Sequence, residues 1–218
     1  MDILYRLPFP YNVCGKIFMY ACKSPHTGLG GAMLKKIVGL PFYKEYCINK
    51  RGKEFGVNYC KRNIVELNSC HWRNEKKANF DIVRLYMLPK LIWLYLNKTS
   101  VYGEIVHLNL LTNLIEIDLS HTDVSGDIIH LKSLHNLTDI HLCDTDVTGN
   151  IVHLKSLLNL VLIDLDNTGV IGDILYLKSL PNLDIISFKN TGVLVENEST
   201  FHVHRERVGL HECEVFFD

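Results

Sequence analysis

The stretch HTDVSGDIIHLKSL, residues 121–134, recurs almost letter for letter as DTDVTGNIVHLKSL at residues 144–157, 23 positions further along the chain. The same spacing continues in both directions as a series of threonines at Thr99, Thr122, Thr145, Thr168 and Thr191. Glycines keep the spacing too, at Gly103, Gly126, Gly149 and Gly172. A duplicated catalytic site is improbable, whereas duplicated structural units are common, so the period predicts a stacked repeat protein.

One unit, taken from Leu137 to Leu157, follows the pattern LxxIxLxxTxVxGxIxxLxxL. Its first three apolar positions predict a short strand with one buried face, and those after Thr145 close the core. Burying the seven apolar side chains of a unit contributes roughly 10–20 kcal/mol. Ordering the backbone costs about 1–2 kcal/mol per residue over 23 residues. A single unit therefore cannot fold alone, and the units must stack.

The pattern resembles the leucine-rich-repeat family, whose unit of 20–29 residues runs LxxLxLxxN(or C)xL. The resemblance covers roughly residues 62–218, and the glycine and isoleucine after the valine are similar to the plant-type subfamily, without the proline usual there. It implies an α/β solenoid, a leucine-rich-repeat horseshoe with a parallel sheet on its concave face. Threonine stands at the family's Asn/Cys position, where its hydroxyl can bond the backbone of the loop that leaves the strand.

The incomplete units at the two ends can be aligned with the regular ones. Upstream, Leu67 takes the place of Leu96, which requires a six-residue insertion. Downstream, Val215 takes the place of Leu165, after a four-residue insertion. The domain over 62–218 is thus expected to hold seven strands: one irregular, five regular and one terminal.

Residues 1–61 do not repeat, and their apolar spacing predicts a small helical domain that caps the solenoid. Within it, LPFPYNVCGKIFMYA at 7–21 resembles the opening of an F-box. That resemblance implies a substrate receptor of a cullin-type ubiquitin ligase, which would contact the adaptor subunit through Leu7, Pro8, Ile17 and Phe18. The later Trp-centred part of the F-box pattern is not evident. The alternative is a helical cap with an incidental Leu-Pro.

The charge and cysteine content of the chain argue against several classes of partner and location. The net charge of -1 gives no general attraction to nucleic acid or membrane, and we expect neither as a partner. The seven cysteines are odd in number and irregularly spaced, which indicates free thiols rather than a disulfide framework. The N-terminus lacks the features of a secretory signal. We therefore expect an intracellular, cytoplasmic protein with no cofactor; the sequence does not set its oligomeric state.

The outward-facing positions of the predicted strands are the strongest candidate for a functional surface. They are acidic in the middle, with aromatic residues at one end, which suits a protein partner that carries a basic patch. The residues expected to bind this partner are Trp93, Tyr95, Glu116, Asp118, Asp139, His141, Asp144, Asp164 and Asp166. The plain alternative is that any solvated strand face is polar.

Enzymatic and metal sites are weaker candidates. Asp118 and Asp164 would lie two rungs apart on an open surface, where no shifted pKa is expected, so we predict no catalysis. A zinc set of His202, His204, His211 and Cys213 conflicts with the repeat, because Cys213 falls at a core position. The periodic His107, His130 and His153, and Lys132, Lys155 and Lys178, are explained by duplication alone. No metal is therefore expected.

Overall fold

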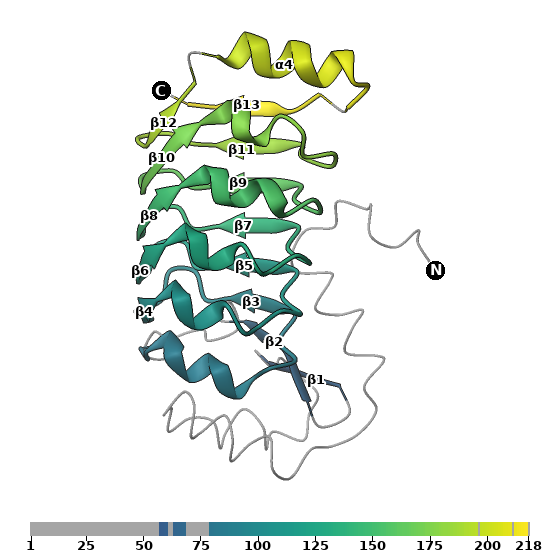
Figure 1. The fold of residues 1–218 in the computed structure, drawn as a ribbon. Helices are drawn as coiled ribbons and strands as arrows, with labels where there is room; N and C mark the ends of the chain where they lie inside the picture. The colour runs from purple at the N-terminus through teal and green to yellow at the C-terminus, as the bar shows by residue number, and fades with distance from the viewer. Residues whose placement is uncertain (1–56, 61–62, 69–78, 196, 211, 218) are drawn as a thin grey trace.

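The computed structural model describes residues 57–60, 63–68, 79–195, 197–210 and 212–217, which form one column of stacked rungs (Figure 1). The predicted helical cap up to residue 56 and the F-box-like segment lie outside the described residues. In the described part of the chain, no helix combines the length and apolar character that a membrane crossing requires.

Each rung contributes one short strand to a long sheet. Its parallel strands are β2 (Asn63–Asn68), β3 (Trp93–Tyr95), β5 (Glu116–Asp118), β7 (Asp139–His141), β9 (Leu162–Asp164), β11 (Ile185–Ser187) and β13 (Glu214–Phe216). These are the seven strands that the sequence predicts. An eighth strand, β1 (Val57–Cys60), pairs antiparallel with β2 at the edge of the sheet. Helical structure was expected at these residues, but they form a hairpin with β2. The hairpin covers the otherwise open edge of the first rung.

The first rung is aligned differently from the sequence prediction. Leu67 pairs with Leu94 rather than taking the place of Leu96, so the two rungs are 27 residues apart and the insertion is four residues, not six. Leu94 and Leu96 are both fully buried. Because side chains on a strand alternate, a shift of two residues keeps the same face buried, and the apolar pattern cannot distinguish the two alignments.

The last rung shows the same error in the opposite direction. Val215 pairs with Ile186, which is the equivalent of Ile163, and not with the position equivalent to Leu165. The step from Ile186 to Val215 is 29 residues, so the insertion is six residues rather than four. The physical reason is again the two-residue period of a strand.

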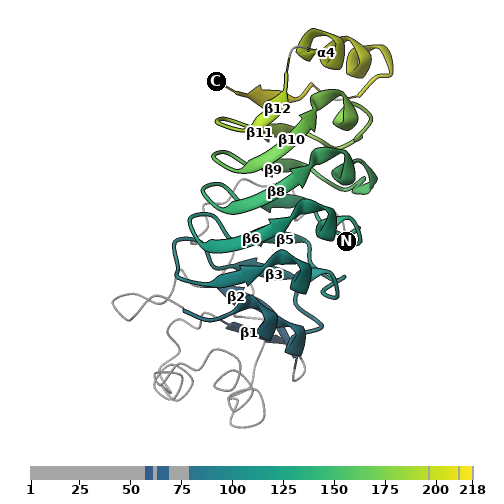
Figure 2. The same cartoon turned by 60° about the vertical axis from the view of Figure 1, so that its left-hand side comes forward.

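A second parallel sheet, which the sequence analysis did not predict, lies on another side of the column (Figure 2). Its strands are β4 (Tyr102–Glu104), β6 (Asp123–Asp127), β8 (Asp146–Asn150), β10 (Gly169–Asp173) and β12 (Gly192–Leu194). Each rung then returns to the long sheet through a 3₁₀ helix. These helices are η1 (Ile82–Met87), η2 (Ile105–Leu108), η3 (Ile128–Leu131), η4 (Ile151–Ser156) and η5 (Ile174–Leu177).

The repeated apolar positions form the core as predicted. The unit that begins at Leu137 buries all seven of its apolar pattern residues completely. Thr145 donates its hydroxyl hydrogen to the carbonyl oxygen of Leu142 at 2.6 Å, and the equivalent threonine of every regular rung makes the same bond. The predicted role of this threonine is confirmed.

A series of asparagines, which the sequence analysis did not identify, forms hydrogen bonds between each rung and the preceding one. Asn136 donates its side-chain amide to the carbonyl oxygen of Thr112 at 2.8 Å, and Asn159 donates to that of His135 at 2.8 Å. Asn113 and Asn182 repeat the arrangement. The 23-residue spacing of these asparagines was the available signal.

The glycine with positive φ in a rung lies against the side chain that caps the 3₁₀ helix of the preceding rung. Asp127 accepts a hydrogen bond from the backbone N–H of Ile129 at 2.8 Å and so caps η3. Gly149, at φ 102°, lies so close that an added Cβ would overlap Oδ1 of Asp127. At Gly126, with a similar φ of 113°, the nearest atoms to an added Cβ are 3.4 Å away, because Glu104 makes no cap there.

This difference predicts unequal effects of two identical substitutions. Both Gly149→Ala and Gly126→Ala place an alanine at positive φ, but only the first creates an overlap. We expect Gly149→Ala to lower the free energy of unfolding by about 1–3 kcal/mol more than Gly126→Ala, measured by urea denaturation. Adding Asp127→Ala should recover part of that loss. Equal losses in the two single variants would contradict this coupling.

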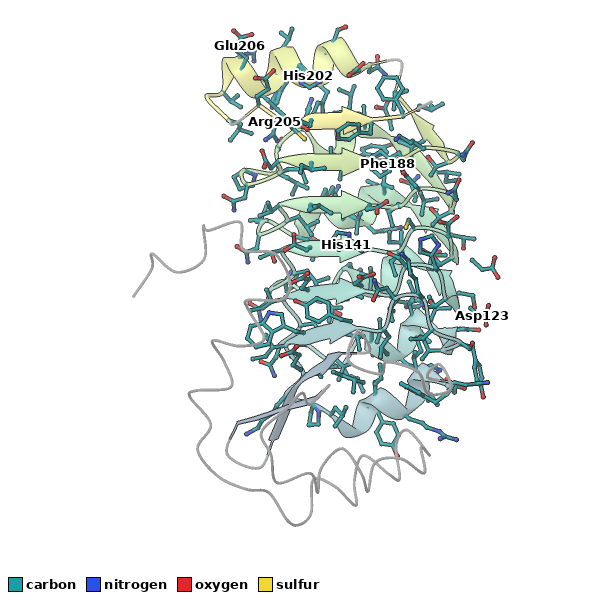
Figure 3. The ribbon with its side chains drawn as sticks, turned by 180° about the vertical axis from the view of Figure 1, so that it is seen from behind. Asp123, His141, Phe188, His202, Arg205 and Glu206 are labelled. Carbon is teal, nitrogen blue, oxygen red and sulfur yellow. The ribbon has the colours of Figure 1, made fainter. Side chains whose placement is uncertain are left out.

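Helix α4 (Glu198–Arg207) covers the C-terminal end of the column (Figure 1). It buries Phe201 and Arg205 against the last rungs. The Arg205 guanidinium donates to the carbonyl oxygens of Leu180 and Leu183, both at 2.7 Å (Figure 3). The buried arginine therefore gives these two carbonyl oxygens hydrogen-bond partners at the end of the column.

Candidate functional site

The long sheet presents one broad face, which we call the sheet face. The middle residue of each three-residue strand is buried and its two neighbours point outward. Strand pairing aligns these neighbours into two columns, with His141 near the centre (Figure 3). The columns are Trp93, Glu116, Asp139, Leu162, Ile185 and Tyr95, Asp118, His141, Asp164, Ser187. Seven of the nine residues expected to bind a partner lie among them.

The other two expected residues, Asp144 and Asp166, lie beyond the strand ends at the edge of the sheet face. Asp166 accepts a hydrogen bond from the backbone N–H of Lys189 at 2.7 Å through Oδ1. Asp144 has a left-handed backbone with φ 54°, and it is the most exposed residue of the nine. The other eight, including Trp93 and Tyr95, are half-buried, because side chains on neighbouring strands about 4.8 Å apart cover one another.

The aromatic end of the sheet face is linked to its acidic centre. The Tyr95 hydroxyl donates a hydrogen bond to Oε2 of Glu116 on the neighbouring strand. Burial raises the pKa of Glu116 above its ordinary value, and the charge of Asp139 adds to this, while the bond from Tyr95 opposes it. Tyr95 is therefore held in a fixed orientation beside the acidic residues.

The acidic centre has a histidine embedded in it. His141 Nδ1 lies 3.9 Å from Oδ2 of Asp164. Burial opposes charge on the imidazole, but Asp164, Asp118 and Glu116 outweigh it and raise the pKa of His141. Burial likewise disfavours the charged Asp164, yet the bonds from His141 and from the Asp166 backbone lower its pKa. The expectation of an unshifted pKa was therefore wrong for Asp164, because hydrogen bonds from His141 and the Asp166 backbone stabilise its charged form.

A group of metal-binding residue types, missed in the sequence, lies at the edge of this face. His121, Cys143 and Asp144 bring an imidazole nitrogen, a thiol sulfur and a carboxylate oxygen within 4.8 Å of one another. Burial raises the pKa of the Cys143 thiol to about 11, although a hydrogen bond from Ser120 opposes the shift. The residues come from two rungs, 22 and 23 positions apart, so only the repeat register could have revealed them.

Two of the four C-terminal residues considered as a zinc set, His202 and Cys213, make other contacts. His202 Nε2 lies 3.5 Å from Oε1 of Glu198 within α4. Cys213 is buried in the core, as predicted, and burial raises its thiol pKa to about 12. His211 lies outside the described residues. Cys143 and Cys213 are both free thiols, which agrees with the prediction for these two cysteines.

Solved structures with a similar fold include several proteins of plants. A plant ice-binding protein matches with a TM-score of 0.63 and 19% identity over 78% of this chain and 58% of that one. The ectodomain of the plant membrane receptor kinase GASSHO1/SCHENGEN3 from Arabidopsis thaliana matches with a TM-score of 0.60 and 20% identity over 76% of this chain. The ectodomain of the receptor kinase SOBIR1, also from Arabidopsis thaliana, matches with a TM-score of 0.56 and 21% identity. The match covers 74% of this chain and 93% of the SOBIR1 chain.

This chain has the leucine-rich-repeat fold. The predicted fold class is thereby confirmed. At these identities the likeness extends to the fold alone, and this chain spans only 58% of the ice-binding protein and 24% of the GASSHO1/SCHENGEN3 ectodomain. No family model matches the sequence. No curated protein matches it.

Proposed function

We propose that this leucine-rich-repeat chain is a non-enzymatic protein-interaction module that binds a basic segment of a protein partner on the sheet face. The observation that carries the proposal is the charge of the two columns. Four carboxylates, from Glu116, Asp118, Asp139 and Asp164, surround His141 on three neighbouring strands. None of the ten outward positions on β3, β5, β7, β9 and β11 is lysine or arginine.

A face that was polar merely because it is solvated would carry both signs of charge. The ten outward positions of these five strands hold four carboxylates and no lysine or arginine, although lysine and arginine together are nearly as frequent in the chain as aspartate and glutamate, at 23 against 24. A surface of one sign attracts and orients an oppositely charged segment. Trp93 and Tyr95 at one end add large, rigid side chains of the kind that anchor protein interfaces.

The rigidity of the sheet favours binding over catalysis. Backbone pairing fixes the outward positions, so a partner loses little affinity to ordering this surface. Asp118 and Asp164 are two strands apart, roughly 9–10 Å, on an open face. This separation gives no enclosed space for a reacting group, and the proposal assigns no residue a catalytic role.

Two structures of the same fold, each seen with a binding partner, support a protein or peptide ligand. The GASSHO1/SCHENGEN3 ectodomain is seen in complex with CASPARIAN STRIP INTEGRITY FACTOR 2. PEPR1, with a TM-score of 0.59 and 22% identity, is seen with AtPEP1. The F-box interpretation rests on residues outside those described, and no observation on the described chain favours it. The intracellular, cytoplasmic location likewise stays a prediction.

The proposal predicts that disrupting the sheet face abolishes binding while an equivalent change elsewhere does not. The test variant is Trp93→Ala with Asp118→Lys. The control is Tyr102→Ala with Asp123→Lys, which removes an exposed aromatic residue and reverses an exposed acid on paired strands of the second sheet. We expect the test variant to bind a lysine- and arginine-rich peptide at least tenfold more weakly than wild type, measured by fluorescence anisotropy.

The control should bind as wild type does, and an acidic peptide of equal length should bind to neither. In a pull-down from cell extract, partners held by wild type and the control should be missing from the test variant. Partners retained after Trp93→Ala with Asp118→Lys would refute the assignment to the sheet face.

A further inference from the structure

We propose that His121, Cys143 and Asp144 form a binding site for a divalent transition-metal ion, Zn²⁺ foremost, at the edge of the sheet face. The site lies in the loops that follow β5 and β7, where one rung supplies the imidazole and the next supplies the thiol and the carboxylate. It does not depend on the proposed partner binding, with which it shares only Asp144.

The distances suit a four-coordinate ion. Nδ1 of His121 lies 3.0 Å from Oδ2 of Asp144, and all three donor atoms fall within 4.8 Å of one another. In a tetrahedral zinc site, with bonds of about 2.0–2.3 Å, ligand atoms are roughly 3.3–3.8 Å apart. The imidazole and carboxylate are already close to that separation, whereas the Cys143 sulfur, which interacts with Ser120 and Asp164, lies within 4.8 Å of them and has to move closer by up to about 1 Å.

The fold holds the two outer ligands in place before any ion binds. His121 and Asp144 occupy the same position in consecutive rungs, both with left-handed backbones at φ 55° and 54°. The His121 N–H donates to the carbonyl oxygen of Cys143, and the Asp144 N–H to that of Asp166, each at 2.9 Å. The Asn167 amide donates to Oδ1 of Asp144 at 2.9 Å, which leaves Oδ2 directed at His121. Such outer contacts are what orient metal ligands in proteins.

The chemistry of the donors selects the ion. Nitrogen and sulfur donors favour Zn²⁺ and related transition metals, whereas Ca²⁺ and Mg²⁺ require sets of oxygen donors. Binding releases the thiol proton of Cys143 to solvent, because the thiolate is the ligand. Three protein ligands leave one coordination position for water, and His121 and Asp144 are exposed, so the ion can enter from solvent. The competing explanation is a simple ion pair of His121 and Asp144 beside a cysteine.

The chain itself supplies conservative substitutions that remove each donor. The substitution Cys143→Ser introduces serine, which already occupies the equivalent position, Ser120, in the preceding rung. His121→Asn and Asp144→Asn introduce asparagine, which already occupies the equivalent left-handed position, Asn167, in a later rung. Lys98→Asn makes the same kind of change at the same position of a rung outside the cluster, and it serves as the control.

The test is a titration of the tag-free, reduced full chain with Co²⁺, followed by Zn²⁺ competition. Wild type and Lys98→Asn should develop a cobalt–thiolate charge-transfer band that saturates at one ion per chain and is displaced by Zn²⁺. Cys143→Ser should lose the band, and His121→Asn and Asp144→Asn should bind Zn²⁺ at least about tenfold more weakly. Zn²⁺ should also raise the melting temperature of wild type by more than that of the three site variants.

Three results would overturn the site. One is the absence of a band at millimolar Co²⁺, which would leave only the ion pair. Another is a band that survives Cys143→Ser, which would place the ion on a different cysteine. The third is unchanged zinc affinity in His121→Asn and Asp144→Asn. Melting curves of the zinc-free variants show whether each variant is folded. The Lys98→Asn control shows whether a substitution at this left-handed position affects the protein when no proposed metal ligand is removed.

Discussion

Leu142→Asp should abolish cooperative folding of this chain. Leu142 is completely buried, and its backbone N–H donates to the carbonyl oxygen of Asp164 in the next rung, so its side chain lies between stacked rungs. A carboxylate there would have neither water nor a cationic partner. We expect a loss of more than about 4–5 kcal/mol of unfolding free energy, a large part of the total that a domain of this kind possesses. Thermal unfolding followed by circular dichroism measures it.

The matched control is Thr148→Asp, which introduces the same charge into the same rung at an exposed position of β8. Its melting temperature should stay within a few degrees of wild type, because surface substitutions are usually within about 0.5 kcal/mol. A melting temperature unchanged by Leu142→Asp would mean that the assignment of inward and outward positions is wrong, and the sheet face with it.

Arg205→Met should have the second largest effect, concentrated at the C-terminal end. Arg205 is 1% exposed, and its guanidinium satisfies the carbonyl oxygens of Leu180 and Leu183. Methionine fills a similar space but donates no hydrogen bond, so two buried carbonyl groups lose their partner at about 1–3 kcal/mol each. We expect urea denaturation to show a loss of about 2–5 kcal/mol, with faster hydrogen exchange in α4 and η5 than in η2 and η3.

Arg207→Met is the control for Arg205→Met, because Arg207 is exposed on the same helix. It removes the same charge without uncovering a carbonyl group, and its stability should match that of wild type. Equal losses in the two variants would show that net charge on α4, rather than the two hydrogen bonds, stabilises the end of the column.

The sheet face was predicted from the sequence, whereas the edge cluster was missed. Each outward residue of a three-residue strand lies next to an inward leucine or isoleucine, so the repeat register alone placed Trp93, Asp118 and His141 on one surface. His121 and Cys143 are 22 residues apart and belong to different rungs. Their proximity depends on the left-handed turn after each strand, which the apolar pattern does not specify, although the 23-residue register aligns His121 with Asp144.

The sequence by itself determined the period, the buried positions and the seven parallel strands of the long sheet, because 23-residue units with the same apolar pattern have one common way to stack. Tertiary structure decided what the period leaves open. It fixed the alignment of the end rungs, where a two-residue shift buries the same face. It added the second sheet, supplied Arg205 as the C-terminal cap, and brought His121 to Asp144. These features depend on contacts between rungs or at the ends of the column, and a pattern read within one rung does not contain them.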